Sequence, residues 1–260
     1  MKRLPTLQAL VEHADELLST ASTPDYPNAV NGLQFENTGA LKGIATAVDF
    51  SIRTIEGTLA AAANLLVVHH GMFWSGLVPH TGRAHERLRM LLENDIAVYA
   101  SHLPLDRHPS LGNNTLLARE LGLRPSAGFA RFREIDIGVR GKTDVETAEL
   151  ADRVRRFSAL HGTHAVIAGN TKKRRTRRWA ICTGSGATAE TLKEAGSTGI
   201  DTLIVGEGPH WTAVQSEENG LTVMYAGHYA TETLGVRALG EHLSKKFSIP
   251  STFIDAPTGL

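Results

Sequence analysis

The sequence predicts an α/β protein built from two interlinked, pseudo-repeated α/β domains, each a small sheet flanked by helices. Strand-like apolar runs alternate with segments of helical periodicity along the whole chain. The chain has 260 residues, of which 42% are hydrophobic, and this length fits one large domain or two of ordinary size. The order of elements in the first half also recurs in the second half, which favours two domains.

In the first half, helical and strand patterns follow one another at short intervals. Apolar residues recur at three- and four-residue spacing over 7–19, which predicts an opening helix. The Pro-, Asn- and Gly-rich stretch 23–39 is expected to be mostly loop. The elements expected after it are a strand over 43–49, a helix over 51–63, the strand LLVVHH ending at 70, a helix over 84–95 and a strand over 96–102.

The second half repeats that order. Its expected elements are a strand in WAICTGSGA (179–187), a helix over 189–195, a strand in IDTLIVGEGPHW (200–211), a helix over 212–219 and a strand in LTVMYAGHYATE (221–232). Both copies end with the same spacing, His102-x3-Asp106 after YAS and His228-x3-Glu232 after YAG. Chance alone produces strand-helix-strand echoes in α/β proteins, but the matching endings favour a duplication.

The segment between the two copies, 131–170, has a helical pattern over 145–158 and a strand-like run over 164–168. We assign this segment to the second domain. The predicted domains are therefore 1–127, completed by 222–260, and 128–221.

Composition narrows the classes of function and the expected location. Lys+Arg and Asp+Glu are equal at 27 each, and this zero net charge argues against a protein that binds nucleic acid over its whole surface. The single cysteine, Cys182, excludes an intramolecular disulfide and suits a reducing compartment. The start of the chain lacks the apolar core and cleavage site of a signal peptide, and no apolar run reaches the roughly 18 residues of a membrane span. We expect a cytoplasmic protein with no membrane partner.

Two adjacent histidines, His69 and His70, end a fully apolar strand. In open α/β sheets, functional groups gather beyond the carboxyl ends of the strands, and Asp106, His228 and Glu232 stand at such ends too. Adjacent side chains of a strand point to opposite faces, so both histidines can serve one cavity only where the strand ends. Gly71 is expected to supply the freedom to turn there. A pair of metal ions, one for each imidazole, accounts for the doubled histidine.

The five residues together favour a metal site over isolated structural roles. A lone histidine is usually a hydrogen-bonded core or surface residue, but three imidazoles and two carboxylates after apolar strands carry a heavy desolvation cost without a counter-ion. We predict that His69, His70, Asp106, His228 and Glu232 bind two divalent ions, held about 3.5–4 Å apart and sharing a water. Mixed imidazole and carboxylate ligands suit Zn, Fe, Mn, Co or Ni, and the choice among these stays open.

His102 has three possible roles: a further ligand, a residue that orients Asp106, or a proton shuttle. We favour an orienting or acid–base role and take His102 as the catalytic candidate. Other histidines are interpreted as surface or polar-packing residues, namely His13, His80, His85, His161 and His242.

At this point the sequence resembles a known family, the dinuclear-metal-centre hexameric proteins, also called Nif-three-like or GTP cyclohydrolase 1 type 2 homologues. The resemblance runs over nearly the whole chain, through PNAVNGLQFE, VVHHGMFW, SHLPLDRHPSLGNN, GEGPH, AGHYATET and TFIDAP. The combination of HH, HLPLD and GHYATE is more specific than any single piece. The single modest middle segment is similar to that of the short bacterial members.

The family's motif residues fall on positions already selected. Its adjacent histidines match His69 and His70, its aspartate matches Asp106, and its last motif matches His228 and Glu232. The resemblance implies two interlinked α/β domains and a ring-shaped homohexamer with metal pairs lining an inner cavity. The cyclohydrolase name implies opening of the purine ring of GTP by metal-activated water, but the sequence has no Walker-type phosphate loop.

Two other stretches have competing interpretations. The Gly184-Ser185-Gly186 segment can receive a phosphate at a helix start, although a tight strand-to-helix turn is the commoner use of such a segment. The run 172-KKRRTRR-178 can contact nucleic-acid phosphates, and six copies in a ring would form a basic surface. The simpler interpretation of this run is a solvated loop or hairpin.

Three functions stay open on the sequence alone. The first is a dinuclear-metal hydrolase acting on a nucleotide-like or heterocyclic small molecule. The second is a non-catalytic metal-binding ring that contacts nucleic acid or a protein partner, for instance in a DNA damage response. The third is metal delivery or storage. The substrate, the reaction and the native metal do not follow from the sequence.

Overall fold

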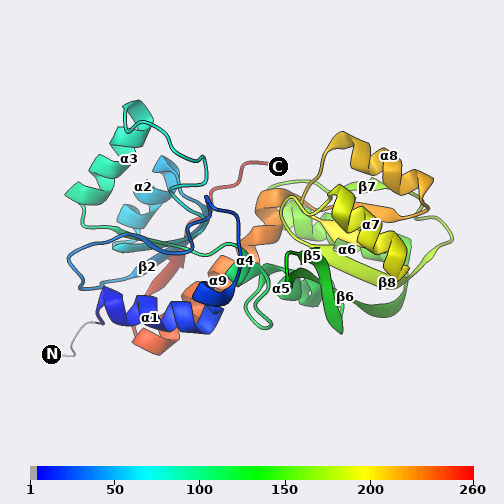
Figure 1. Cartoon of the computed structure of the whole chain (residues 1–260), viewed down its shortest axis with the longest axis horizontal. Coiled ribbons are helices and arrows are strands. Elements are labelled where there is room, and N and C mark those ends of the chain that lie inside the picture. The colour runs from blue at the N-terminus through cyan, green and yellow to red at the C-terminus, as the bar shows by residue number, and fades with distance from the viewer. Residues whose placement is uncertain (1–4) are drawn as a thin grey trace. The chain divides into compact units, whose positions relative to one another are not determined.

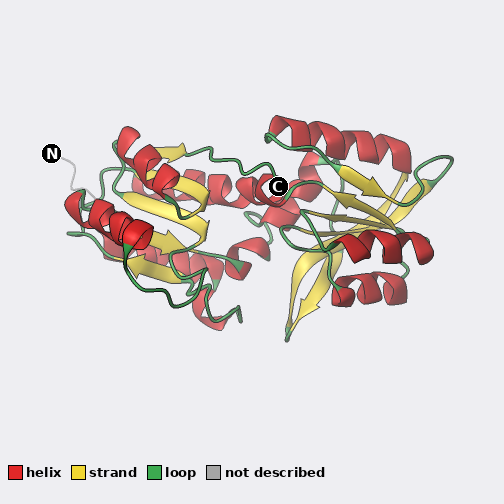
Figure 2. Ribbon diagram, turned by 90° about the horizontal axis from the view of Figure 1, so that it is seen from above, coloured by secondary structure: helices red, strands yellow, loops and turns green. Residues whose placement is uncertain are grey.

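The computed structural model describes residues 5–260, and they form two compact units, each a sheet with helices on its faces (Figures 1 and 2). The first unit comprises residues up to 105 together with 235–256, and the second comprises 106–234 with 257–260. The elements of the first unit are α1 (Leu7–Leu18), the 3-10 turn η1 (Thr20–Ser22), β1 (Gly32–Phe35), β2 (Ile44–Asp49), α2 (Ile52–Ala60), β3 (Leu65–His70), α3 (Gly82–Glu93), β4 (Ala97–Ala100) and β11 (Ser251–Phe253). Two helices contain residues of both units, α4 (Leu103–Asp106) and α9 (His228–Phe247).

The second unit is built from the middle of the chain. Its elements are α5 (Asn113–Glu120), β5 (Ala127–Phe132), β6 (Ile135–Glu146), α6 (Thr147–Leu160), β7 (Val166–Ala168), β8 (Arg175–Cys182), α7 (Ala189–Thr198), β9 (Thr202–Val205), α8 (His210–Glu218) and β10 (Thr222–Tyr225). Among the described residues, no helix has the length and apolar character that crossing a membrane requires.

The first sheet has the strand order β1-β4-β3-β2-β11, in which only β1 runs antiparallel to its neighbour. Leu66 and Val68 of β3 pack with Ile55 of α2 and Leu91 of α3 in one apolar cluster. On another strand, the hydroxyl of Tyr99 donates to Asp15 of α1 at 2.8 Å. Because both faces are covered, the central strands are continuously apolar, as in other parallel sheets.

The second sheet has the order β5-β6-β8-β9-β10-β7, with β8, β9 and β10 parallel. Trp179 and Ile181 of β8 pack against α5 and α6, while the alternate residues Ala180 and Cys182 pack against α7. This alternation along one strand places apolar side chains on both faces of the sheet.

The duplication predicted from the sequence is present in the topology. In each unit three parallel strands are joined by two helices, and an antiparallel strand lies beside the third, β1 beside β4 and β7 beside β10. The equivalent helices α2 and α7 also begin with the same reciprocal cap, Ser51 with Thr54 and Thr188 with Thr191. Such a cap satisfies backbone N–H groups that a helix start leaves without partners. The α/β fold class is therefore confirmed.

Some elements differ from the sequence expectation. Residues 23–39 were expected to be mostly loop, yet they contain the edge strand β1, which forms only because it pairs with β4. The helix expected from 145 begins at Thr147, because β6 runs through Glu146 and pairs with β8 up to that residue.

The bounds of the two units also differ from the predicted domains, which divided the chain at 127 and 222. Residues of α5 pack into the core of the second unit through Leu117 and Ala118. Strand β10 likewise belongs to the second unit, since it is hydrogen-bonded between β9 and β7. Long-range pairing of this kind leaves no mark in the local sequence.

Candidate metal centre

The first unit brings three histidines together. His69 and His70 end β3, and His102 follows β4, the neighbouring strand of the sheet. All three are buried, and one ring nitrogen from each lies within 4.8 Å of the others. The ring centroids of His69 and His102 are 4.9 Å apart, and those of His69 and His70 are 4.8 Å apart. The carboxyl ends of two parallel strands therefore present three imidazoles to one small volume, as open α/β sheets do with their functional groups.

A hydrogen-bond acceptor holds the Nδ1 atom of each ring. The carbonyl oxygen of Ser101 lies 2.9 Å from Nδ1 of His69, and a carboxylate oxygen of Asp49 lies 2.8 Å from Nδ1 of His70. Because these oxygens can only accept, Nδ1 carries the proton and the neutral ring has its lone pair at Nε2. Metal-binding histidines are usually oriented by such an acceptor.

His102 is held in the same way by a residue that the sequence interpretation missed. A carboxylate oxygen of Asp25 lies 2.8 Å from Nδ1 of His102, and the Asp25 side chain is only 6% exposed. Burial alone raises the pKa of this carboxyl, but hydrogen bonds from His102, Asn31 and the backbone N–H of Leu103 outweigh it, and the pKa is lowered overall. Asp25 is therefore an anion fixed behind the third imidazole.

The proximity of His102 to the histidine pair changes the interpretation of its role. The sequence alone favours an orienting or acid–base function over metal binding. In the fold its imidazole stands beside His69 and His70, with the same Nδ1 arrangement, so it has the geometry of a ligand as much as that of a proton carrier. The structure therefore supports the alternative that the sequence left open, in which His102 is a further metal ligand.

Gly71 has a different reason to be glycine from the one expected. It is not among the glycines with a left-handed backbone. A Cβ atom at this position would lie 2.3 Å from Oε1 of Gln34, and that oxygen accepts the backbone N–H of Met72 at 2.6 Å. The glycine therefore makes room for the Gln34 amide, which holds the chain as it leaves β3.

Aromatic side chains border the three histidines. The ring centroid of Trp74 lies 4.6 Å from that of His70 and 4.6 Å from that of His102, and Tyr26 is 6.0 Å from His102. This wall restricts the directions from which water or a ligand reaches the imidazoles.

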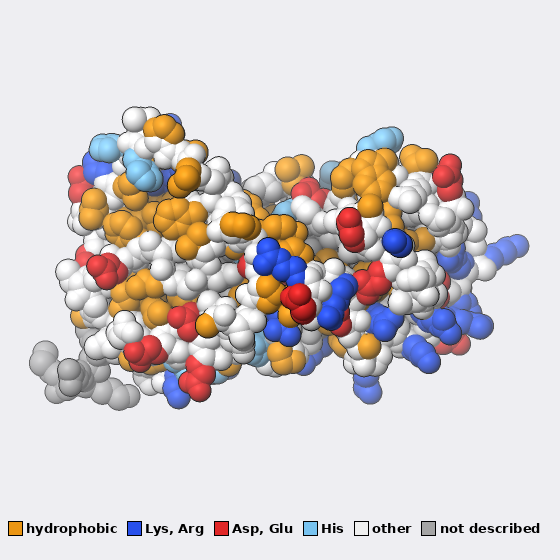
Figure 3. Space-filling view, in the orientation of Figure 1, with side chains coloured by type: hydrophobic (Ala, Val, Ile, Leu, Met, Phe, Trp, Pro, Cys, Tyr) orange, Lys and Arg blue, Asp and Glu red, His pale blue; other side chains and the backbone are white. Residues whose placement is uncertain are grey.

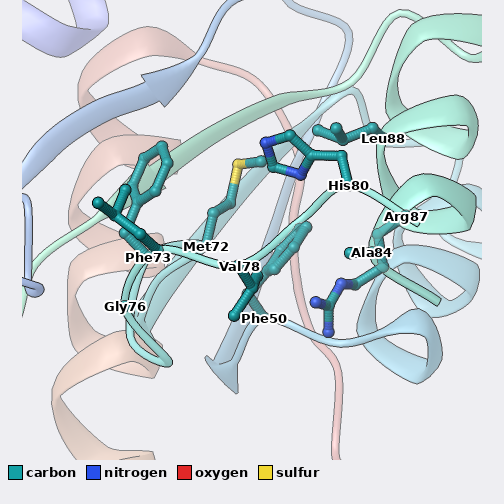
Figure 4. Close-up of a pocket in the computed structure, with 10 residues that line it drawn as sticks. Phe50, Met72, Phe73, Gly76, Val78, His80, Ala84, Arg87 and Leu88 are labelled. Atoms are coloured by element: carbon teal, nitrogen blue, oxygen red, sulfur yellow. The ribbon is translucent and has the colours of Figure 1, made fainter. Parts of the chain in front are cut away.

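A separate apolar cavity of about 60 Å³ lies in the same unit (Figure 4). It is lined mainly by Phe50, Met72, Phe73, Val78 and Leu88, with His80 beside them. The lining offers one imidazole and no carboxylate, so the cavity lacks the donor set that a divalent ion requires.

The second unit carries the other three candidate residues. Asp106 is buried at the end of α4, where its Oδ1 atom accepts a hydrogen bond from the Asn113 amide at 2.8 Å and lies 3.4 Å from the hydroxyl of Thr183. Thr183 directly follows β8, and the next residue, Gly184, approaches Glu232. Asp106 and Glu232 therefore both lie against the segment that leaves β8.

His228 lies between two carboxylates. Its Nδ1 atom is 2.8 Å from Oε1 of Glu207, and its Nε2 atom is 3.1 Å from Oε2 of Glu232, one turn further along α9. Burial disfavours the charged imidazole, but the two carboxylates outweigh burial and raise the pKa of His228 to about 9. In the metal-free protein at neutral pH, His228 is therefore a cation that donates to Glu207 and forms an ion pair with Glu232. A metal ion would take the place of the Nε2 proton.

The Gly184-Ser185-Gly186 segment forms a tight turn, with the N–H of Gly186 donating to the carbonyl of Gly184 at 2.8 Å. Gly184 has a φ of +62°, and a Cβ atom there would lie 2.2 Å from Oε1 of Glu232. The hydroxyl of Ser185 donates to Glu207 at 3.1 Å. The turn thus positions the carboxylates of Glu207 and Glu232 beside His228. The sequence interpretation considered a phosphate site or a simple turn here and did not include this role.

The two donor sets fit transition-metal ions. One unit supplies three buried imidazoles with Nδ1 atoms held by acceptors. The other supplies His228, held by Glu207, beside the buried carboxylate of Glu232. Asp106 is buried in that unit too, but among the described residues it does not join a group of three ligand atoms within 4.8 Å of one another. These are borderline nitrogen and hard oxygen ligands, which suit Zn, Fe, Mn, Co or Ni. Three acids orient histidine rings. Asp49 ends an apolar strand and Glu207 follows one, which is the same sequence position that selected the proposed ligands. Asp25 lies in a loop, where the sequence gives no such indication.

Other histidines lie apart from these sets. His13 and His242 stack with their Nε2 atoms 3.0 Å apart, and Nδ1 of His161 lies 2.9 Å from the carbonyl of Phe157. These contacts agree with polar packing. His85 is exposed on α3.

Comparison with known proteins gives consistent matches over nearly the whole chain. The family model described as Duf34/NIF3 (NGG1p interacting factor 3) matches residues 5–258. A curated relative from Deinococcus radiodurans, named GTP cyclohydrolase 1 type 2 homolog, is 39% identical over 251 residues, which cover 96% of this chain and 93% of the relative.

Two solved structures give the same result. A protein named ybgI, of unknown function, is similar with a TM-score of 0.88 and 35% identity, covering 98% of this chain and 100% of its own. TTHA1606 from Thermus thermophilus is similar with a TM-score of 0.83 and 32% identity, again covering 98% of this chain and 100% of its own.

Proposed function

Because the chain belongs to the Duf34/NIF3 family, we propose that it is a metal-dependent hydrolase with two divalent ions per chain, acting on a nucleotide-like or heterocyclic small molecule. The proposed ligands are His69, His70, Asp106, His228 and Glu232. The name shared by the curated relatives, GTP cyclohydrolase 1 type 2 homolog, supports a purine-like substrate. Assembly as a homohexamer and a cytoplasmic location belong to the same proposal and rest on the resemblance of the sequence.

The observation that carries the proposal is the shared arrangement of the histidine rings. Acceptors hold Nδ1 in all four, Ser101 behind His69 and a carboxylate behind each of the others. Orienting four largely buried rings alike costs conformational entropy and desolvation, and it serves no apolar core. Metal binding through Nε2 explains the arrangement in His69, His70 and His228, because the acceptor at Nδ1 fixes both the tautomer and the direction of the Nε2 lone pair. The same arrangement in His102 suits a proton carrier beside them.

The protein's own groups define what the site does. When bound, a pair of divalent ions supplies Lewis acidity and lowers the pKa of water. His102 is the proposed proton carrier, because Asp25 holds its ring through Nδ1 and leaves Nε2 to accept and return a proton. In the metal-free protein Glu232 balances the positive charge of His228, and both side chains would hold a metal ion once that proton has left. Trp74 restricts solvent access from the side of His70 and His102.

The first test is elemental analysis of protein purified without added metal. We expect about two ions per chain, and a clear loss in His69→Ala. The exposed His85 provides a matched control, since His85→Ala removes an imidazole without touching the cluster. Equal metal content in all three proteins would refute the site.

The second test addresses catalysis. Metal-loaded protein is assayed with a panel of nucleotides that includes GTP and oxidised purines, beside Glu232→Gln. Turnover that requires both the metal and Glu232 supports the hydrolase. A protein that keeps its metal but shows no such turnover retains the metal site and loses the enzymatic role.

A further inference from the structure

The basic run 172-KKRRTRR-178 does not act as one cluster in the fold. Arg174 donates to the backbone carbonyls of Asp201 and Gly220, at 3.0 and 2.7 Å. Arg175 forms ion pairs with Asp144 and Glu146 on the neighbouring strand β6. Both arginines therefore make contacts within the second unit. The charge of Arg175 is balanced by two carboxylates, and the guanidinium of Arg174 donates to backbone carbonyls.

Arg178 has a different environment. It lies on β8 directly opposite Lys142 of β6, and Arg140 follows on the same face of β6 two residues away. No ion pair with a carboxylate is formed by these three side chains within residues 5–260. Like charges directly opposite one another in an antiparallel pair are destabilising. An uncompensated arrangement of this kind favours an external anion as the missing partner.

The three cations line a groove. Arg140, Lys142 and Arg178 border a hollow of about 240 Å³, together with hydroxyl-bearing Ser126 and Thr198. Lys142 and Arg178 also border a second hollow of about 450 Å³ that adds Arg177. The cationic groove, defined by these two hollows, contains one carboxylate, Asp144, which is paired with Arg175 and also lies 3.9 Å from Nε of Arg177. In Figure 3, Lys and Arg side chains gather on the part of the second unit that carries β6 and β8.

The cationic groove is separate from the candidate metal residues. Arg178 lies six positions before Gly184, and this separation corresponds to about 20 Å along an extended chain. A substrate held at Asp106, His228 and Glu232 does not place its phosphate there. Because two hollows share the Lys142 and Arg178 wall, the cations are spread over the space of more than one phosphate group.

We propose that the cationic groove, formed by Arg140, Lys142 and Arg178, binds the phosphate backbone of a nucleic acid. Arginine pairs with phosphate oxygens through two N–H groups at once, and lysine adds a point charge. The exposed hydroxyl of Ser126 can donate to a further phosphate oxygen, whereas that of Thr198 already donates to the carbonyl of Glu194 at 2.7 Å. The groove does not depend on the metal function, so either can fail without the other.

The test is fluorescence anisotropy with a labelled single-stranded DNA of about 20 nucleotides, titrated with the full-length, metal-loaded protein at several salt concentrations. The variant carries Arg140→Gln, Lys142→Gln and Arg178→Gln. We expect at least about a tenfold loss of affinity at low salt. The slope of log affinity against log salt should fall in magnitude by about 2, because each lost phosphate contact on a single strand removes about 0.7.

A matched control removes the same charge elsewhere, through Lys42→Gln, Lys245→Gln and Lys246→Gln in the first unit, where all three side chains are exposed. Equal losses in the variant and the control would overturn the proposal, since only net charge would matter. So would an absence of binding by the wild-type protein. Inorganic pyrophosphate tests the other source of phosphate: if it binds the groove and the DNA does not, the nucleic-acid assignment is wrong. A melting temperature no lower than that of wild type and an unchanged metal content confirm that the variant is folded, since removing the facing like charges should not destabilise it.

Discussion

The orienting role of Asp25 leads to a quantitative prediction for Asp25→Asn, a change that keeps the size of the side chain and removes its charge. The two carboxylate oxygens receive four donors. Oδ1 lies 2.8 Å from Nδ1 of His102 and accepts the N–H of Tyr26 at 2.7 Å, while Oδ2 accepts from Asn31 at 2.8 Å and from the N–H of Leu103 at 2.9 Å. Each oxygen accepts from two donors, so whichever one is replaced by the amide NH2 group, two N–H groups lose their acceptor and face another donor.

The size of the effect follows from that count. A hydrogen bond to a charged group contributes about 1.5–3 kcal/mol, so the loss of two lowers the free energy of unfolding by about 3 kcal/mol or more. For a chain of this size, about 2–4 °C of melting temperature corresponds to each kcal/mol, so we expect a decrease of about 6–12 °C. Metal affinity should fall about 10–100-fold if His102 is a ligand, because its ring loses its orientation.

Asp49→Asn is the matched control. Asp49 holds His70 through one hydrogen bond of the same length, but its side chain is 41% exposed, against 6% for Asp25. The amide oxygen introduced by Asp49→Asn can still accept from Nδ1 of His70 while its NH2 group faces solvent, so the cost should be about 0.2–1 kcal/mol. Calorimetry of the metal-free proteins measures both stabilities, and competition with a fluorescent chelator measures metal affinity.

The pH dependence gives a second check on Asp25. Its pKa in the folded protein lies below the ordinary value of 3.8, so the ionised carboxylate stabilises the fold above that value and loses this contribution as the pH falls through the folded pKa. The stability difference between wild type and Asp25→Asn should be constant around neutral pH and should shrink in strong acid. A difference that is the same for Asp25→Asn and Asp49→Asn, or that grows on acidification, would refute the reasoning.

Two further predictions concern the second unit. Gly184→Ala should lower both stability and metal content, because the new Cβ atom would lie 2.2 Å from Oε1 of Glu232. Gly220→Ala is the matched control, because Gly220 has a similar φ of +66° and a Cβ atom there would meet nothing within 4 Å. It should lower the free energy of unfolding only through backbone strain, by about 1–2 kcal/mol, and leave the metal content unchanged. Equal metal content in both variants would contradict this account. Because the pKa of His228 is about 9, metal binding at pH 7 should release about one proton from this residue, and the release should diminish as the pH approaches 9. Isothermal titration in buffers of different ionisation enthalpy measures this proton. Its absence from wild type would contradict the charged state of His228, and its persistence in His228→Ala would show that another group supplies it.

Local sequence patterns were sufficient where an element is defined by its own residues. The run LLVVHH coincides with β3, because six consecutive buried residues are long enough to mark a central parallel strand. The paired endings around His102 and His228 indicated the duplication, and the equivalent capped helices α2 and α7 support it.

Features that depend on distant partners were missed. The strand β1 has only four residues in a stretch rich in Pro and Asn, and pairing with β4 creates it. Asp25 acquires its role because the loop that carries it folds back onto His102, which lies 77 residues further along the chain. The basic run looked like one surface, yet the fold uses Arg174 and Arg175 internally and joins Arg178 to Lys142 and Arg140 of another strand.

The four oriented imidazoles differ in how exposed they are to genetic change. A side-chain carboxylate holds His70, His102 and His228, so a single codon change can release any of these rings. The backbone carbonyl of Ser101 holds His69, and every amino acid at that position carries the same carbonyl. Random mutagenesis should therefore rarely disturb His69 through its neighbour, whereas single substitutions at Asp49, Asp25 or Glu207 should free the other three rings.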